Sequence, residues 1–261
     1  MTTTIALAGK GGVGKTTVAA LIIKYLARTQ PGAVLAIDAD PSSNLNMVLG
    51  LDLEWTVGDI REGLLEEVKH SLTQTGAAMG TVAGGSTKQE YLDYEIRSAL
   101  AEGEKIDLIA MGQPEGPGCY CAVNHNLREV IDAISRTYRY VVIDNEAGME
   151  HLSRRTTRNV EQLLIVTDPT QRGLVAAQRI AKFRHELDID IENTGLIVNR
   201  LRGEIPPALQ AGIDSLDVPL VGIIPDDDAL YEFDLSGRPL VELGSDSPVF
   251  AAVAGIASRL V

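Results

Sequence analysis

The chain has 261 residues and a formal net charge of −13. This acidity argues against binding to nucleic acid or to an anionic membrane surface, because both need a basic face on the protein. Hydrophobic residues make up 45% of the chain and aromatic residues only 4%, which predicts a core of aliphatic side chains like that of buried parallel strands.

The spacing of the two cysteines, Cys119 and Cys121, is poor for a structural disulfide and indicates a reducing compartment. Met1–Thr4 leads straight into the first apolar run, and no stretch of about 18 apolar residues is present. We therefore expect a cytoplasmic protein. Regular alternation of strand and helix patterns favours one α/β domain over residues 1–261.

The first predicted strand, Thr4–Ala8, precedes a glycine-rich loop and an apolar helical stretch. The loop has the spacing G-x-x-x-x-G-K-[ST], in which backbone N–H groups surround a phosphate chain at the positive end of a helix. Lys15 would then contact the outer phosphate oxygens, and the Thr16 hydroxyl would be free for Mg²⁺. The predicted nucleotide-binding residues of this loop are Gly11, Gly12, Val13, Gly14, Lys15, Thr16 and Thr17.

Two acidic residues follow the second predicted strand, Val34–Ile37. Asp38 and Asp40 would lie at the carboxyl edge of the strand, where open α/β sheets bind ligands. A competing interpretation for Asp38 is that it caps the helix that starts after Asn44.

Lys10 adds a second feature to the glycine-rich loop. The string Lys10–Thr17 resembles the deviant P-loop of the family that includes MinD, ParA, the arsenite-pump ATPase and the nitrogenase iron protein. The resemblance implies a doubly wound, mostly parallel sheet flanked by helices, with ATP or ADP and Mg²⁺ as ligands. It also implies a nucleotide-dependent homodimer in which Lys10 reaches the partner's nucleotide. Asp40 then matches the first switch, where it would orient the attacking water and lie near Mg²⁺.

The stretch between Asp52 and Gly103 is less regular. Apolar spacing predicts helices over Val57–Val68 and Glu90–Ala101. The residues between them, around 70–89, are rich in Gly, Ser, Thr and Ala, and we expect a mobile surface insert there.

A Cys-x-Cys loop over residues 112–122 follows the strand Ile106–Met111 and precedes a helix expected to begin near Asn124. Cys119 and Cys121 supply two soft ligands, half of what a tetrahedral zinc or square-planar nickel site needs. The same loop of a second chain could supply the other half across a two-fold axis. The alternative is a pair of small buried residues or a redox-reactive pair.

The strand Tyr140–Asp144 ends in an acid, as a Walker B segment does. Asp144 could hold a water or a hydroxyl group on Mg²⁺. In the deviant P-loop family the second switch reads D-x-x-x-G, so the resemblance implies that Gly148 contacts the γ-phosphate through its backbone.

Two further strand ends complete the predicted site. Thr194–Val198 leads to Asn199 and Arg200, and the resemblance implies that the asparagine reads the adenine edge, although Asn199 could also be a simple turn former. The backbone of Pro225 and Asp226, after the last strand, would close over the adenine ring. A helix is expected over Gly173–Leu187, and the tail Pro248–Val261 would pack one apolar face on the sheet.

Two stretches, Met111–Cys121 and Asn145–Arg155, closely resemble the CooC family, ATPases that assist nickel insertion into carbon monoxide dehydrogenase. The resemblance implies a metallochaperone that carries Ni²⁺, or Zn²⁺ in the same site, on Cys119 and Cys121 of two chains. Its client would be carbon monoxide dehydrogenase. Alternatives are a maturation ATPase for acetyl-CoA synthase, a MinD- or ParA-type positioning ATPase and an iron-protein-like reductase. The reductase uses two cysteines far apart in sequence, unlike this adjacent pair.

Overall fold

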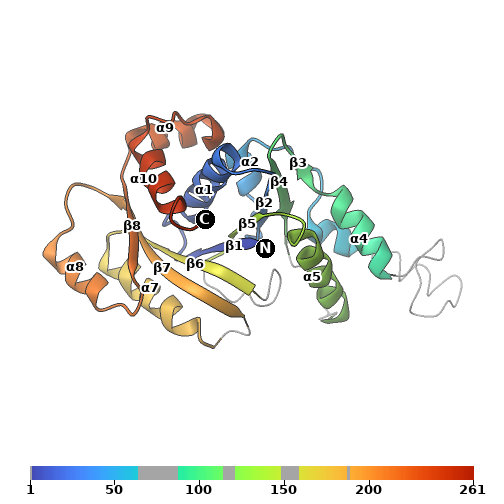
Figure 1. The fold of residues 1–261 in the computed structure, drawn as a ribbon, viewed down its shortest axis with the longest axis horizontal. Coiled ribbons are helices and arrows are strands. Elements are labelled where there is room, and N and C mark those ends of the chain that lie inside the picture. Colours follow the sequence, from blue (N-terminus) through green and yellow to red (C-terminus); the bar gives the residue numbers. More distant parts are fainter. Residues whose placement is uncertain (1, 64–87, 114–120, 148–158, 187–188) are drawn as a thin grey trace, which may run out of the picture.

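The computed structural model describes residues 2–63, 88–113, 121–147, 159–186 and 189–261 (Figure 1). Their eight strands form one sheet in the order β3-β4-β2-β5-β1-β6-β7-β8. All neighbouring strands are parallel except the edge pair β3 and β4. This confirms the predicted mostly parallel α/β sheet. The strands are β1 (Thr3–Gly9), β2 (Val34–Asp38), β3 (Ala101–Glu102), β4 (Ile106–Ala110), β5 (Tyr140–Asp144), β6 (Asn159–Thr167), β7 (Asp190–Leu201) and β8 (Leu220–Pro225).

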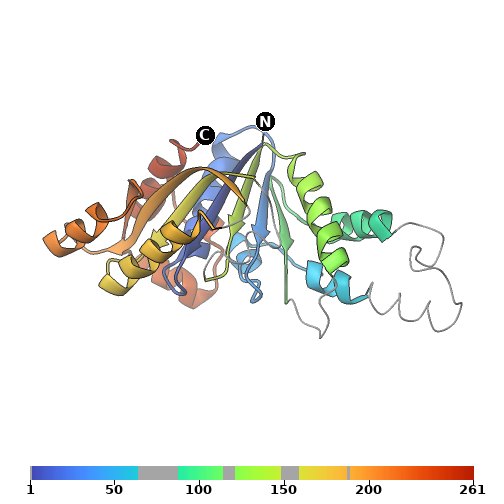
Figure 2. The same ribbon diagram turned by 90° about the horizontal axis from the view of Figure 1, so that it is seen from below.

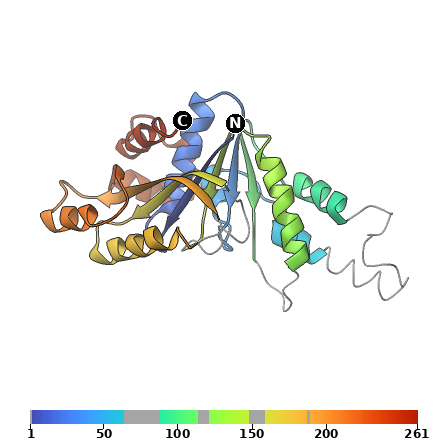
Figure 3. The same ribbon diagram turned by 60° about the horizontal axis from the view of Figure 1, so that its bottom comes forward.

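Helices cover both faces of the sheet because successive strand residues point to opposite sides. In β1, Ile5 and Leu7 belong to one buried cluster, and Ala6 and Ala8 to the other. The first cluster packs under α1 and α10, the second under α5 and α7 (Figure 3). The helices are α1 (Lys15–Thr29), α2 (Leu45–Leu49), α4 (Lys88–Ser98), α5 (Cys121–Ser135), α7 (Gln171–Phe183), α8 (Pro207–Asp214), α9 (Asp228–Ser236), the 3₁₀ turn η1 (Leu240–Glu242) and α10 (Pro248–Ala257), and residues 57–63 are also helical.

Several predicted boundaries were wrong. The helix expected over Glu90–Ala101 begins at Lys88 and ends at Ser98, and Ala101 instead pairs antiparallel with β4 as an edge strand. The helix expected near Asn124 begins at Cys121. The helix expected over Gly173–Leu187 begins earlier, because the Thr170 hydroxyl accepts the Gly173 N–H, and its last residue is Phe183. Helix ends depend on such caps more than on apolar spacing.

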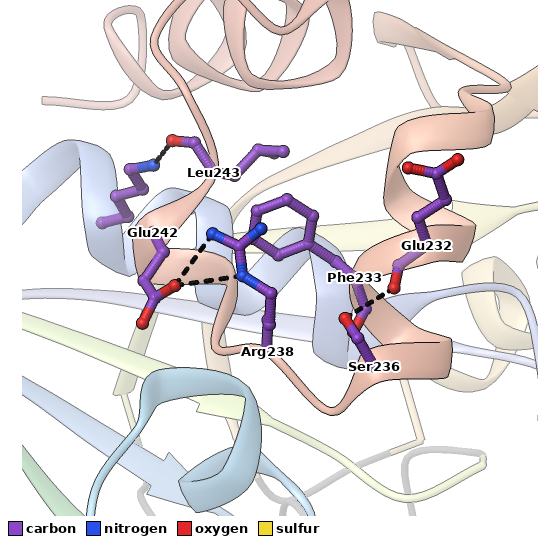
Figure 4. A network of polar contacts seen from close by, with 7 residues as sticks. Glu232, Phe233, Ser236, Arg238, Glu242 and Leu243 are labelled. Carbon is purple, nitrogen blue, oxygen red and sulfur yellow. Dashed lines mark hydrogen bonds and ion pairs between the residues drawn. The ribbon is translucent and has the colours of Figure 1, made fainter.

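A tight polar turn joins α9 to η1 on the α1 side of the sheet (Figure 4). Gly237 has φ +64°, a left-handed conformation that glycine adopts without steric cost. The Arg238 guanidinium lies over the Phe233 ring at 4.3 Å and pairs with Glu242 at 3.0 Å. These contacts fix η1, which packs against α1 and α2.

The loops that follow the parallel strands gather at one edge of the sheet, the lower edge in Figure 2. The chain leaves β1 for β2, which lies on one side of β1 in the sheet, and later leaves β5 for β6, which lies on the other side. Such a switch point leaves a crevice outside the carboxyl ends of the strands. The glycine-rich loop therefore starts in the position where this fold class binds ligands.

We expect the α1 face of the core to contribute strongly to stability. Leu21 is fully buried, so Leu21→Ala should lower the free energy of unfolding by about 2–5 kcal/mol through lost burial and a residual cavity. Leu235→Ala is the matched control, because that side chain is 76% exposed and its loss should cost no more than about 0.5 kcal/mol. Urea unfolding measures both values. Equal losses in the two variants would contradict this assignment of the core.

Candidate nucleotide site

The glycine-rich loop presents a helix N-terminus without any side-chain cap. The N-cap residue of α1 is Gly14, with φ +90°, and no acidic side chain occupies the first turn. Gly9 permits the close exit from β1, because a Cβ there would lie 2.3 Å from the Val166 carbonyl oxygen. The first N–H groups of α1 therefore have no partner within their helix and are available to an anion.

The two loop lysines lie in different environments. Lys15 is only 7% exposed, and its ammonium group donates to the Lys10 carbonyl oxygen over 3.4 Å. The Lys10 side chain is exposed. The arrangement keeps one cation inside the loop and one at its surface, and the separate roles of Lys15 and Lys10 stay predictions.

Asp144 and Thr16 meet below the loop. The Thr16 hydroxyl donates to Asp144 Oδ2 over 2.6 Å, and Asp144 is 1% exposed. Burial raises the pKa of Asp144 to about 7, an increase that the Thr16 hydrogen bond opposes and the nearby Asp38 charge reinforces. The other carboxylate oxygen, Oδ1, is buried without a hydrogen-bond partner. A hydroxyl beside a buried oxygen that lacks a partner fits the hard oxygen ligands that Mg²⁺ prefers.

The two acidic residues after β2 differ in their partners. Asp38 is buried and accepts the backbone N–H groups of Asp40, over 3.1 Å, and Leu45, over 2.9 Å. Burial raises its pKa to about 6 despite these bonds. Leu45 is the first residue of α2, so Asp38 accepts a free N–H group at the start of that helix, as its alternative interpretation expected, although the N-cap residue is Asn44. Asp40 is half-buried and accepts the N–H and hydroxyl of Ser42.

The ends of β7 and β8 reach the same edge. The Asn199 amide donates to the Val13 carbonyl oxygen over 2.8 Å, and the Arg200 guanidinium donates to that of Gly12 over 3.1 Å. Pro225 ends β8, and the next residue, Asp226, donates its N–H to Leu201 and pairs with Arg202. The adenine roles of Asn199, Pro225 and Asp226 stay predictions.

One polar residue at this edge was not singled out from the sequence. Asn145 follows Asp144 directly and is 1% exposed; its amide donates to the Leu7 carbonyl oxygen over 2.7 Å. Its own Oδ1 is buried without a partner. The available signal was its position at the end of a buried strand, next to an acid.

Several predicted residues lie outside the described part of the chain. These are Gly148, Cys119 and residues 70–87 of the expected insert. Cys121 begins α5, but its side chain is also outside the description. Among the described residues, no three His, Cys, Asp or Glu side chains gather closely enough to hold a metal ion. The same residues contain no helix with the length and apolarity needed to span a bilayer.

Known proteins resemble the chain over nearly its full length. It is 41% identical over 257 residues to an uncharacterized ATP-binding protein of Methanocaldococcus jannaschii, covering 98% of each chain. It is 29% identical over 241 residues to the carbon monoxide dehydrogenase accessory protein CooC of Rhodospirillum rubrum, covering 92% of this chain and 89% of that protein. The septum site-determining protein MinD of Synechocystis is also 29% identical, over 262 residues, with 98% and 88% covered.

Solved structures give the same result for the fold. MinD of Pyrococcus horikoshii, in complex with Mg-ADP, superimposes with a TM-score of 0.68 at 25% identity, covering 99% of this chain and 96% of that one. The CobQ/CobB/MinD/ParA nucleotide-binding domain matches residues 4–240. The chain therefore belongs to the CobQ/CobB/MinD/ParA family and is a nucleotide-binding ATPase domain.

Proposed function

We propose that the protein is an ATP-dependent metallochaperone that carries nickel to the active-site cluster of carbon monoxide dehydrogenase. One observation carries the proposal. The Cys-x-Cys loop leaves β4 at the nucleotide edge, where the Met111 N–H donates to the Asp38 carbonyl oxygen over 2.8 Å. The CooC relative supports this function, and the MinD relative, of equal identity, supports only the ATPase class.

In this proposal residues 1–261 form one ATPase domain that works as a homodimer. The free N–H groups of the loop and the Lys15 ammonium bind the phosphates, and Lys10 reaches the partner's nucleotide. Asp40 orients the attacking water, and Gly148 contacts the γ-phosphate. Thr16, Asp40 and Asp144 would hold Mg²⁺ directly or through water, and that ion would neutralise phosphate charge when bound.

Nickel is the cargo of the proposed protein, and the ligands would be Cys119 and Cys121 from each of two chains. A pair of chains supplies the four thiolates that a single chain lacks. ATP hydrolysis would then alter the dimer that holds the metal. Maturation of acetyl-CoA synthase is the alternative client. A positioning ATPase on DNA or membrane is disfavoured by the net charge of −13.

We expect Lys15 and Asp40 to separate binding from hydrolysis. Lys15→Ala should weaken nucleotide binding and abolish turnover, because it removes the cation inside the loop. Asp40→Asn should retain binding but slow hydrolysis by at least about 100-fold, through loss of water orientation. Phosphate release and nucleotide titration measure the two effects. Asp52→Asn, an exposed change of the same kind, is the control; normal turnover in Asp40→Asn would remove Asp40 from the mechanism.

Mg²⁺ binding should weaken in acid. The pKa of Asp144 is raised to about 7, so below that pH a proton competes with the cation for the carboxylate. The Mg²⁺ concentration that half-saturates the ADP complex should rise by up to roughly tenfold for each pH unit below that value. Asp144→Asn lacks the titrating carboxylate, so its pH dependence of Mg²⁺ binding reports the contribution of the nucleotide's own phosphates. An identical pH profile in wild type and Asp144→Asn would contradict the assignment.

The metal site is the direct test of the proposed function. Wild-type protein should bind one Ni²⁺ or Zn²⁺ per dimer, and the metal should strengthen the dimer because it links two chains. Cys119→Ser and Cys121→Ser should each abolish tight metal binding and metal-dependent dimerisation while ADP binding persists. Equilibrium dialysis and analytical ultracentrifugation measure the two properties.

Lys15→Ala is the reciprocal control, since it should weaken nucleotide binding and leave metal binding unchanged. One tightly held ion per monomer, or a metal-linked dimer that survives in the double cysteine variant, would place the ligands elsewhere and reject the proposal.

A further inference from the structure

The carboxyl end of β7 departs from regular strand geometry. Its register with β8 shifts between Val198 and Leu201. Within this irregularity, Arg200 has φ +60°, in the left-handed region that residues other than glycine adopt at a steric cost. Irregularities of this kind redirect side chains, and they occur often beside active sites. Here Asn199 and Arg200 both contact the glycine-rich loop.

Each of the two side chains holds one loop carbonyl group. Asn199 Nδ2 donates to Val13 O over 2.8 Å, and Arg200 Nη1 donates to Gly12 O over 3.1 Å. The Arg200 backbone N–H in turn donates to Asn199 Oδ1 over 3.0 Å, which fixes the orientation of the amide. Asn199 is 5% exposed, and a Cβ on Gly14 would lie 2.5 Å from its Nδ2. The contact is therefore close and largely shielded from water.

Peptide geometry connects these carbonyl groups to phosphate binding. The carbonyl oxygen of one residue and the N–H of the next point in opposite directions across a trans peptide unit, and the described residues contain no cis peptide. Holding Gly12 O and Val13 O from the β7 side therefore turns the N–H groups of Val13 and Gly14 away from β7. These N–H groups belong to the predicted phosphate-binding loop.

We propose that Asn199 and Arg200 are positioning residues that hold two peptide units of the glycine-rich loop with their N–H groups directed toward the phosphate chain. Their effect is on the phosphates and does not depend on the base. This goes beyond the adenine contact predicted for Asn199, whose Oδ1 already accepts one hydrogen bond, from the Arg200 N–H. It is also independent of the nickel proposal, since neither residue takes part in metal binding.

The deciding probe is tripolyphosphate, which has phosphates and no base. We expect Arg200→Ala to weaken the binding of ATP and of tripolyphosphate by the same factor. That factor should be about 3–10-fold, as for the loss of one hydrogen bond at an exposed side chain. Asn199→Ala should weaken both by about tenfold or more, because it leaves a buried carbonyl group without its partner. Competition against a fluorescent ADP analogue, with Mg²⁺ present, measures both affinities.

Two further variants separate geometry from charge and from folding. Arg200→Gln keeps an amide donor without the charge, so it should retain at least part of the affinity that Arg200→Ala loses. If Arg200 instead attracted the phosphates directly through its charge, only Arg200→Lys would retain affinity. Arg97→Ala removes the same charge from an exposed pair on α4 and should change neither affinity. The melting temperature without ligand should change little in Arg200→Ala.

The proposal is overturned if tripolyphosphate binds the Asn199→Ala and Arg200→Ala variants as tightly as wild type while ATP binding weakens, since that result assigns the pair to the base. If only Arg200→Lys retains affinity for the two ligands, Arg200 does not act as a hydrogen-bond donor to the loop carbonyl group, and its proposed role is overturned.

Discussion

The uncapped N-terminus of α1 is the feature on which the rest of the site depends. A helix end without capping side chains leaves its first backbone N–H groups without partners in the helix, so that a ligand or water must supply the missing bonds. Gly14 takes the N-cap position with φ +90°, where a side chain would collide with Asn199. The protein therefore keeps an anion-binding surface open at the centre of its sheet.

Buried carboxylates surround this surface and give it a second property. Asp144 and Asp38 are both 1% exposed, and burial raises the pKa of each, to about 7 and about 6. A pKa above the unfolded value means that ionisation disfavours the folded state, so this contribution to stability is lost as the pH rises from the unfolded pKa toward the folded one. A bound cation would offset the penalty. Burial of these two carboxylates thus lowers the stability of the folded protein when they ionise, and it favours the binding of a cation beside them.

Backbone contacts also join the nucleotide edge to the start of the cysteine loop. Met111 donates its N–H to Asp38 and accepts the Gly58 N–H over 3.0 Å. Gly112 has φ +64°, and a Cβ there would lie 2.2 Å from the Thr56 hydroxyl oxygen. The first residues of the loop are therefore fixed between the end of β2 and the helix over residues 57–63. Under the proposed function, this is the physical connection between nucleotide and metal.

The sequence determined the architecture and the location of the site, because both depend on local patterns. Short apolar runs that alternate with helical patterns indicated the parallel strands, and the spacing from Gly9 to Thr16 indicated the phosphate loop. Tertiary structure decided the rest. Asp38 accepts the first N–H group of α2, and Asn199 and Arg200 donate to loop carbonyl groups 186 and 188 positions away in the chain. Such contacts depend on strand order and on a local break in register, neither of which has a signature in neighbouring residues.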